Sequence, residues 1–294
     1  MTVARLMTAM ITPFQENLEV NYDKAGELAS YLVQQGNDGL VVCGTTGESP
    51  TVTAEEKAKL FSTVVSKVSK ETQVWAGVGS YHTDATLELA REAEKIGVYG
   101  IMVVTPYYNK PSQEGLYQHF KKIAEASSLP VMLYNVPSRT SCNLLPQTVA
   151  RLAEIENIVA LKEASGSLNQ MSELRSLLPP SMTIYSGDDS LTLPMMSLGA
   201  RGVISVVSHL AGTRIKEMIE NFEAGKIQEA RKIHYELFPL FRGLFMVTNP
   251  VPVKEALNMI GMNVGGFRLP LTGLNEKEAD TLQDLLRSYG YIIK

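Results

Sequence analysis

Eight short apolar runs recur along the chain, and segments with helical periodicity separate them. Each run is too short for a typical helix and is rich in Val, Ile, Leu or Met. Continuous rather than alternating apolar strands are typical of parallel sheets that helices cover on both faces. These runs lie at 5–12, 39–44, 73–79, 100–105, 129–135, 157–163, 182–187 and 202–207.

The segments that follow the runs have the spacing of amphipathic helices. One of them begins with Thr53 and Glu56, the pattern of a capping box, and then places Leu60, Val64 and Val68 on one face. Eight strand–helix units predict an α/β protein with a (β/α)₈ (TIM) barrel, while periodicity alone leaves an open, doubly wound sheet as the alternative. The predicted helices lie at 21–35, 53–70, 83–96, 112–127, 144–154, 167–178, 188–198 and 212–224.

Strand signals end near residue 225, and the rest of the chain is predicted to be helical. Segments 226–246, 250–262 and 275–290 have helical character. We therefore expect a catalytic barrel over residues 1–225 and a small C-terminal helical domain over 226–294.

Composition excludes several classes of function. The 294 residues carry a net charge of -4, and Lys and Arg are scattered, so neither nucleic acid nor a membrane surface is an expected partner. No apolar run reaches the ~20 residues of a membrane helix, and the N-terminus does not resemble a signal peptide. We expect a cytoplasmic protein with Cys43 and Cys142 reduced. The four histidines lack the spacing of metal ligands, so no metal is expected.

The sixth apolar run, IVALKE, ends in a lysine. Lys162 is expected at the carboxyl end of a strand, where barrel enzymes place their active sites. One interpretation is structural, with a buried stem and an amine that reaches water. The other is catalytic, because a desolvated amine is more often neutral and can attack a carbonyl carbon to form a Schiff base.

Several neighbouring segments carry groups that suit such a reaction. Tyr134 ends the adjacent run and should emerge beside Lys162, since neighbouring strands are ~4.8 Å apart; it could transfer protons or simply cap the core. Thr45 and Thr46, in CGTTGE, could bind a small carboxylate or only form a tight turn. Arg139 could bind a carboxylate through paired hydrogen bonds or lie on the surface.

The loop TPYYNKP, at 105–111, exposes two tyrosines among prolines. Aromatic side chains in such a loop commonly pack against something, another subunit included.

Together these segments resemble the dihydrodipicolinate synthase family, in the N-acetylneuraminate lyase superfamily of class I aldolases. The resemblance extends from TPF (12–14) to RLPLT (268–272), and its pieces occur in the family's order and spacing. The matching pieces are GTTGES (44–49), TPYYNKPSQEGLYQHF (105–120), LYNVPSRT (133–140), LKEASG (161–166), YSGDD (185–189), GVISV (202–206) and NPVPVK (249–254).

The resemblance implies catalytic roles for four residues. Lys162 matches the lysine that forms a Schiff base with pyruvate, and Tyr134 matches the tyrosine that relays protons. Thr45 and Tyr108 match the partners of that tyrosine in a proton relay, with Tyr108 reaching in from a neighbouring subunit.

Four further residues match substrate-binding positions of the family. Thr46 matches the residue that holds the pyruvate carboxylate, and Arg139 the residue that receives the carboxylate of L-aspartate 4-semialdehyde. Gly187 and Ile204 match positions that line the site through their backbone.

The implied activity is a condensation of pyruvate with L-aspartate 4-semialdehyde that gives 4-hydroxy-tetrahydrodipicolinate, on the route to diaminopimelate and lysine. No cofactor is implied, and most members are homotetramers, built as dimers of dimers. The alternative is a pyruvate-dependent sugar-acid aldolase such as N-acetylneuraminate lyase. Arg139 and Tyr108 favour the synthase, and a barrel retained only as a sensor would need a broken site.

Family members that lysine inhibits bind it at a subunit interface. Ser49 and Tyr107 fit that pattern, but Ala54, Tyr81 and Ala85 replace a histidine, an asparagine and a glutamate. The resemblance therefore predicts weak or absent inhibition by lysine.

Overall fold

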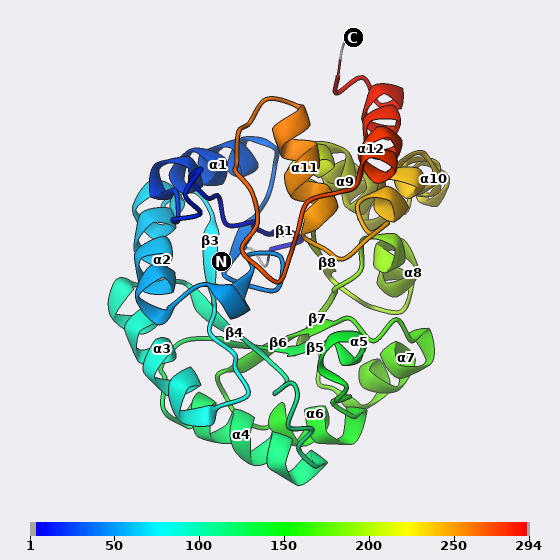
Figure 1. Cartoon of the computed structure of the whole chain (residues 1–294). Coiled ribbons are helices and arrows are strands. Elements are labelled where there is room, and N and C mark those ends of the chain that lie inside the picture. The colour runs from blue at the N-terminus through cyan, green and yellow to red at the C-terminus, as the bar shows by residue number, and fades with distance from the viewer. Residues whose placement is uncertain (1–3, 293–294) are drawn as a thin grey trace.

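The strands form a closed barrel in which every strand is parallel to its neighbours and β8 returns to β1 (Figure 1). The structure is a computed structural model that describes residues 4–292. It confirms the predicted (β/α)₈ barrel and excludes the open sheet. The strands are β1 (Leu6–Ala9), β2 (Gly39–Val42), β3 (Gln73–Gly77), β4 (Gly100–Val104), β5 (Val131–Asn135), β6 (Ile158–Glu163), β7 (Thr183–Ser186) and β8 (Gly202–Ser205).

Helices follow the strands and surround the barrel, as the periodicity predicts (Figure 1). They are α1 (Tyr22–Gln34), α2 (Ala54–Val68), α3 (Thr83–Ile96), α4 (Gln113–Glu125), α6 (Pro146–Leu152), α7 (Leu168–Leu177), α8 (Thr192–Ser197) and α9 (Ser208–Glu223). Three short turns lie in the loops after strands, namely η1 (Ser49–Thr51), α5 (Pro137–Thr140) and η2 (Asp189–Leu191). Neither η1 nor α5 was predicted from the sequence, whereas η2 lies within the helix predicted over 188–198.

The start of α2 shows how local sequence fixes an element. The hydroxyl of Thr53 accepts a hydrogen bond from the Glu56 backbone N–H at 3.2 Å, and the Glu56 carboxylate accepts one from the Thr53 N–H at 2.9 Å. This reciprocal pair confirms the predicted capping box and satisfies two N–H groups that the helix leaves free.

Two buried clusters separate the inside of the barrel from its outer layer. The larger cluster fills the space between strands and helices. The smaller cluster takes side chains from all eight strands, and because successive strand residues point to opposite faces, it fills the barrel interior. Its strand members are Met7, Ala9, Val41, Trp75, Met102, Met132, Tyr134, Ala160, Tyr185 and Ile204.

Three helices follow the barrel, which confirms the helical character predicted beyond residue 225. They are α10 (Ile227–Gly243), α11 (Val251–Met259) and α12 (Glu276–Ser288). Helix α10 packs along α9, and α12 packs against α10 and α11. In Figure 1 the orange and red segment around α11 crosses one end of the barrel near β1, where Phe14 N–H donates to the Val264 carbonyl at 3.0 Å. The division into two domains at residue 225 stays a prediction.

Two findings apply to the described part of the chain, residues 4–292. None of its helices has the length and apolar character needed to cross a membrane. Within the same residues, no group of three or more His, Cys, Asp or Glu side chains is arranged to hold a metal ion. Cys43 and Cys142 are both buried and unpaired, as predicted.

Candidate active site

Lys162 and Tyr134 lie side by side at the carboxyl ends of neighbouring strands. The register of β5 and β6 pairs Tyr134 with Lys162, which confirms the predicted neighbourhood. Lys162 follows Ala160 by two residues and therefore shares its inward face. The Lys162 amine lies 4.4 Å from the centre of the Tyr134 ring, and only 5% of the lysine is exposed. The largely desolvated amine of Lys162 thus faces the phenol ring of Tyr134.

A second tyrosine flanks Lys162 but serves the core. Tyr185, on β7, is also in register with Lys162. Its hydroxyl donates to the Ala4 carbonyl at 2.8 Å, and burial raises its pKa far above the ordinary value. The Tyr134 hydroxyl has no hydrogen bond within residues 4–292. The Tyr185 hydroxyl is therefore satisfied within the core, and a role of Tyr134 in proton transfer stays a prediction.

Tyr134 lines a cavity of about 190 Å³, whereas Lys162 is not among the residues of its wall. Its walls are largely apolar, with Met102, Val104 and Val136, while three predicted site residues supply polar groups. An apolar cleft with a few convergent polar groups is typical of small-molecule sites. Those polar residues are Thr45, Tyr134 and Arg139.

The loop Gly44–Ser49 holds Thr45 and Thr46 at the barrel mouth. Thr45 is half-buried at the cavity, whereas Thr46 is buried. The Thr12 hydroxyl donates to the Gly47 carbonyl at 2.7 Å. A Cβ at Gly47 would lie 3.0 Å from the Cα of Cys43, so glycine permits this close return of the backbone. The loop is a tight turn that also presents hydroxyl groups.

Arg139 lies on α5 at the mouth of the cavity. One of its guanidinium nitrogens donates to the Asn249 backbone carbonyl at 3.3 Å. The Asn249 side chain in turn donates from Nδ2 to the Thr46 hydroxyl at 3.0 Å. The structure thus places one residue from the C-terminal segment between two predicted carboxylate-binding residues.

Gly187 and Ile204 lie around Lys162 on the far side from Tyr134. A Cβ at Gly187 would come within 2.6 Å of the Ala164 Cβ, which must shift, and 3.2 Å of the Lys162 Cε, which would have to move by a few tenths of an ångström. Ile204 is buried in the interior cluster that also contains Tyr134.

The structure does not bring Tyr108 into the cavity. Tyr108 is 91% exposed and has a φ of 74°, a left-handed conformation that is rare for an aromatic residue. The neighbouring Tyr107 lines the cavity instead and packs edge-on against Tyr81, with ring centres 5.2 Å apart.

Two positions on which the predicted weak inhibition by lysine rests lie at the surface. Ala54 and Ala85 are exposed at the starts of α2 and α3. Asp84 is the carboxylate nearest in sequence to Ala85, and it forms a salt bridge with Lys122 at 2.9 Å. It is therefore already engaged with a cation.

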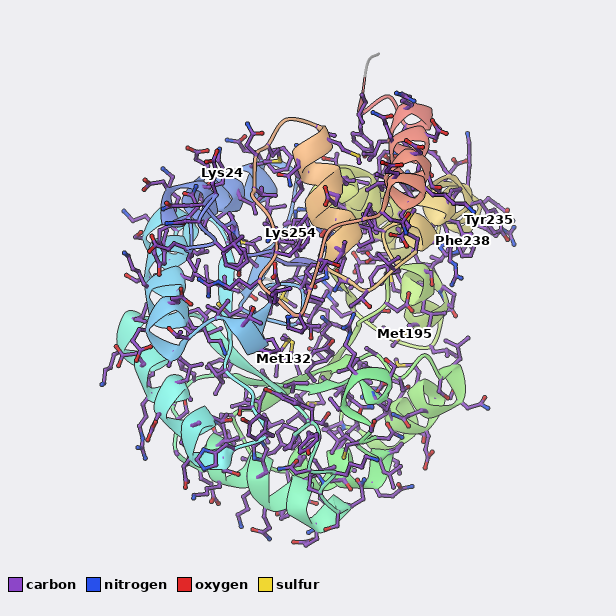
Figure 2. The ribbon with its side chains drawn as sticks, in the orientation of Figure 1. Lys24, Met132, Met195, Tyr235, Phe238 and Lys254 are labelled. Carbon is purple, nitrogen blue, oxygen red and sulfur yellow. The ribbon has the colours of Figure 1, made fainter. Side chains whose placement is uncertain are left out.

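A buried ion pair supports the loop that carries the threonines, and sequence analysis missed it. Lys254 Nζ lies 2.7 Å from Glu48 Oε1 and 2.5 Å from the Gly266 carbonyl, with the lysine and glutamate side chains 0% and 1% exposed. Figure 2 labels Lys254, which belongs to α11, near the middle of the molecule, whereas Tyr235 and Phe238 project from α10. The available signal was a lysine inside the apolar segment NPVPVK.

Two buried titratable groups hold the loop after β8. Asp189 accepts hydrogen bonds from the N–H groups of Val206 and Val207, and burial raises its pKa to about 6. His209 accepts from the Ile11 N–H through Nε2 and donates from Nδ1 to the Val206 carbonyl, while burial lowers its pKa to about 4. The imidazole is therefore neutral in the folded protein at neutral pH.

This arrangement defines a class of protein. A (β/α)₈ barrel with a desolvated lysine and a phenol at the carboxyl ends of adjacent strands is typical of lyases that form Schiff bases. The chain belongs to the dihydrodipicolinate synthetase family, whose model matches residues 2–289.

Individual relatives agree with the family over almost the whole chain. A 4-hydroxy-tetrahydrodipicolinate synthase from Desulforudis audaxviator is 59% identical over 283 residues, covering 96% of each chain. The crystal structure of a dihydrodipicolinate synthase from Bacillus anthracis is 49% identical, covers 99% of each chain and has a TM-score of 0.95. The dihydrodipicolinate synthase from Acinetobacter baumannii, complexed with pyruvate, is 38% identical, covers 99% of this chain and 100% of its own, and has a TM-score of 0.96.

Proposed function

We propose that this protein condenses pyruvate with L-aspartate 4-semialdehyde to give 4-hydroxy-tetrahydrodipicolinate, the first committed step toward diaminopimelate and lysine. The observation that carries the proposal is the pairing of buried Lys162 with Tyr134 at the carboxyl ends of β6 and β5. Relatives that match almost the full length of this chain are named as synthases, and one of them is complexed with pyruvate. No observation favours a sugar-acid aldolase.

The reaction begins with the Lys162 amine. Its nitrogen attacks the keto carbon of pyruvate to give a carbinolamine, and loss of water gives the imine. Tyr134 exchanges protons with the departing oxygen, and Thr45 and Tyr108 connect its hydroxyl to solvent. The imine loses a methyl proton to become an enamine, whose carbon attacks the aldehyde. The amino group of the second substrate then displaces Lys162 and closes the six-membered ring.

The two carboxylates of the substrates bind to different groups. The pyruvate carboxylate accepts hydrogen bonds from Thr46 and the surrounding loop, while Gly187 and Ile204 line the site at Lys162. Arg139, at the cavity mouth, binds the carboxylate of the aldehyde substrate. This division holds the enamine carbon and the aldehyde in one cavity, which lowers the entropy loss of the bimolecular step.

We place the enzyme in the cytoplasm as a homotetramer made of two dimers. Tyr108 supports a subunit contact, because its ring is exposed and its backbone has a positive φ that a free surface aromatic has no reason to keep. In the assembly this tyrosine enters the site of the neighbouring subunit and completes its proton relay.

The first experiment is a condensation assay with both substrates, coupled to dihydrodipicolinate reductase and followed by loss of NADPH. We expect robust turnover. Folded protein that forms an imine with pyruvate but does not turn over the aldehyde would contradict the synthase assignment and indicate a sister lyase. Lys162→Ala tests the nucleophile separately: borohydride should trap no pyruvate adduct, and an adduct would refute the role of Lys162.

A further inference from the structure

Asn249 connects the two groups to which the proposed function assigns the substrate carboxylates. It lies just before α11, and only 5% of it is exposed. Its side-chain Nδ2 donates to the Thr46 hydroxyl at 3.0 Å, and its backbone carbonyl accepts from Arg139 at 3.3 Å. One residue from the C-terminal segment therefore contacts both sides of the site.

The bond to Thr46 determines where the threonine proton points. A hydroxyl has one proton to donate and two lone pairs to accept with, whereas an amide nitrogen only donates. Because Asn249 fills one lone pair of the Thr46 oxygen, the Thr46 proton remains available for another acceptor. A carboxylate is such an acceptor, and a hydrogen bond to a charged group is stronger than a neutral one.

We propose that Asn249 is a positioning residue for both substrates, and the proposal rests on the proposed function. Its amide directs the Thr46 hydroxyl proton toward the pyruvate carboxylate, and its carbonyl anchors Arg139 for the carboxylate of the aldehyde substrate. Asn249 itself takes part in no covalent step.

The surroundings of Asn249 support a directional role over simple packing. Within residues 4–292, its Oδ1 is buried without a hydrogen-bond partner, an unfavourable state that a residue chosen only for stability would avoid. The segment that carries it is fixed five residues later by the buried pair of Lys254 and Glu48, and Glu48 lies two residues after Thr46. The Lys254–Glu48 pair thus holds in place both the segment of the Asn249 amide and the loop of the Thr46 hydroxyl.

The decisive variant is Asn249→Asp, which keeps the shape of the side chain but reverses the bond. The new carboxylate accepts the Thr46 proton and so removes it from pyruvate, and its charge repels the pyruvate carboxylate. The readout is the pyruvate concentration that gives half-maximal borohydride trapping, which requires no second substrate. We expect it to rise about tenfold or more, the effect of losing one charge-assisted hydrogen bond.

The pH dependence adds a signature that packing cannot produce. When the introduced carboxyl group is protonated it can donate to Thr46 as the amide does, so the ratio of variant to wild-type half-saturation should fall toward one as pH is lowered. Irreversible unfolding would instead lower the maximum yield of adduct without moving the half-saturation point, and a Tm well above the assay temperature excludes a reversibly unfolded fraction, which would raise it. An unchanged half-saturation in folded Asn249→Asp would overturn the proposal.

A matched control and a second variant complete the test. Within residues 4–292 the side chain of Asn258, on α11, bonds only backbone groups, at Gly265 and Val264. Asn258→Asp should therefore lower Tm without shifting half-saturation. Asn249→Ala should raise half-saturation in the wild type but add little in a Thr46→Val background, because Asn249 acts through Thr46. Additive effects in this cycle would refute the proposal. Wild-type adduct formation and turnover are measured first, so failure of the proposed function is recognised separately.

Discussion

Removal of the Lys254 ammonium should destabilise the protein strongly, because the ion pair with Glu48 is fully buried. The two side chains are 0% and 1% exposed, and Lys254 also donates to the Gly266 carbonyl. Burial lowers the pKa of Lys254, and the adjacent Glu48 carboxylate opposes that shift. Lys254→Met keeps most of the side-chain volume but leaves Glu48 buried without its cation.

The cost follows from the burial of the remaining charge. Removing one partner of a buried ion pair costs about 3–5 kcal/mol in free energy of unfolding. For 294 residues the entropy of unfolding is about 0.6 kcal/mol per degree at Tm, so we expect Tm to fall by about 5–8 °C. The double variant Glu48→Gln with Lys254→Met leaves no charge at these two positions. It should therefore recover a large part of the lost free energy of unfolding.

Thermal unfolding followed by circular dichroism measures both effects. The matched control is Lys95→Met, which removes a lysine from an exposed i,i+3 pair with Glu92 at 3.2 Å. Exposed pairs contribute little, so Tm of this control should barely change. The reasoning would be refuted if Lys254→Met cost no more than Lys95→Met, or if the double variant were less stable than Lys254→Met alone.

Three further predictions concern pH, catalysis and regulation. The pKa of His209 is lowered to about 4 by burial, below the unfolded value of 6.5, so protons bind the unfolded chain first and stability is lost as pH falls from 6.5 to 4. Between pH 6.5 and 4 the free energy of unfolding should fall less in His209→Gln than in the wild type, by at most roughly 3 kcal/mol. An equal fall in both proteins would contradict this prediction. Gly187→Ala should lower kcat on the order of 10- to 100-fold by displacing Lys162, and wild-type turnover would refute this. Lysine added to the activity assay should inhibit weakly or not at all, because Ala85 offers no carboxylate and Asp84 is engaged; strong inhibition at sub-millimolar lysine would show otherwise.

The barrel could be predicted from the sequence because the signals for its strands and helices are local. Continuous apolar runs mark strands covered on both faces, and the caps and periodicity of helices such as α2 lie within a few residues of one another. The same logic placed Tyr134 beside Lys162, since consecutive parallel strands in a barrel are neighbours. Closure of the sheet was the one global feature, and the count of eight units favoured it.

Contacts between distant segments could not be predicted in this way. Glu48 and Lys254 are 206 residues apart, and no periodicity relates them. Asn249 lies between the segments predicted to be helical at 226–246 and 250–262, so its bond to Thr46 depends on how α10 and α11 return over the barrel. The short helix α5, which carries Arg139, and the outward Tyr108 also depend on surroundings beyond their own segments.

The segment after residue 225 forms helices of its own, but its side chains contact the loop that carries Thr45 and Thr46 and the start of α2. Three of its side chains reach the region between β2 and the first turn of α2: Asn249 bonds Thr46, Lys254 pairs with Glu48, and Arg268 bonds both Glu56 oxygens at 2.7 Å. Without these contacts the loop that presents the threonines would retain its tight turn but lose its buried counter-charge. A boundary at residue 225 therefore separates the barrel, with all its strands, from a segment of helices alone, while groups that hold the loop of Thr45 and Thr46 come from beyond it.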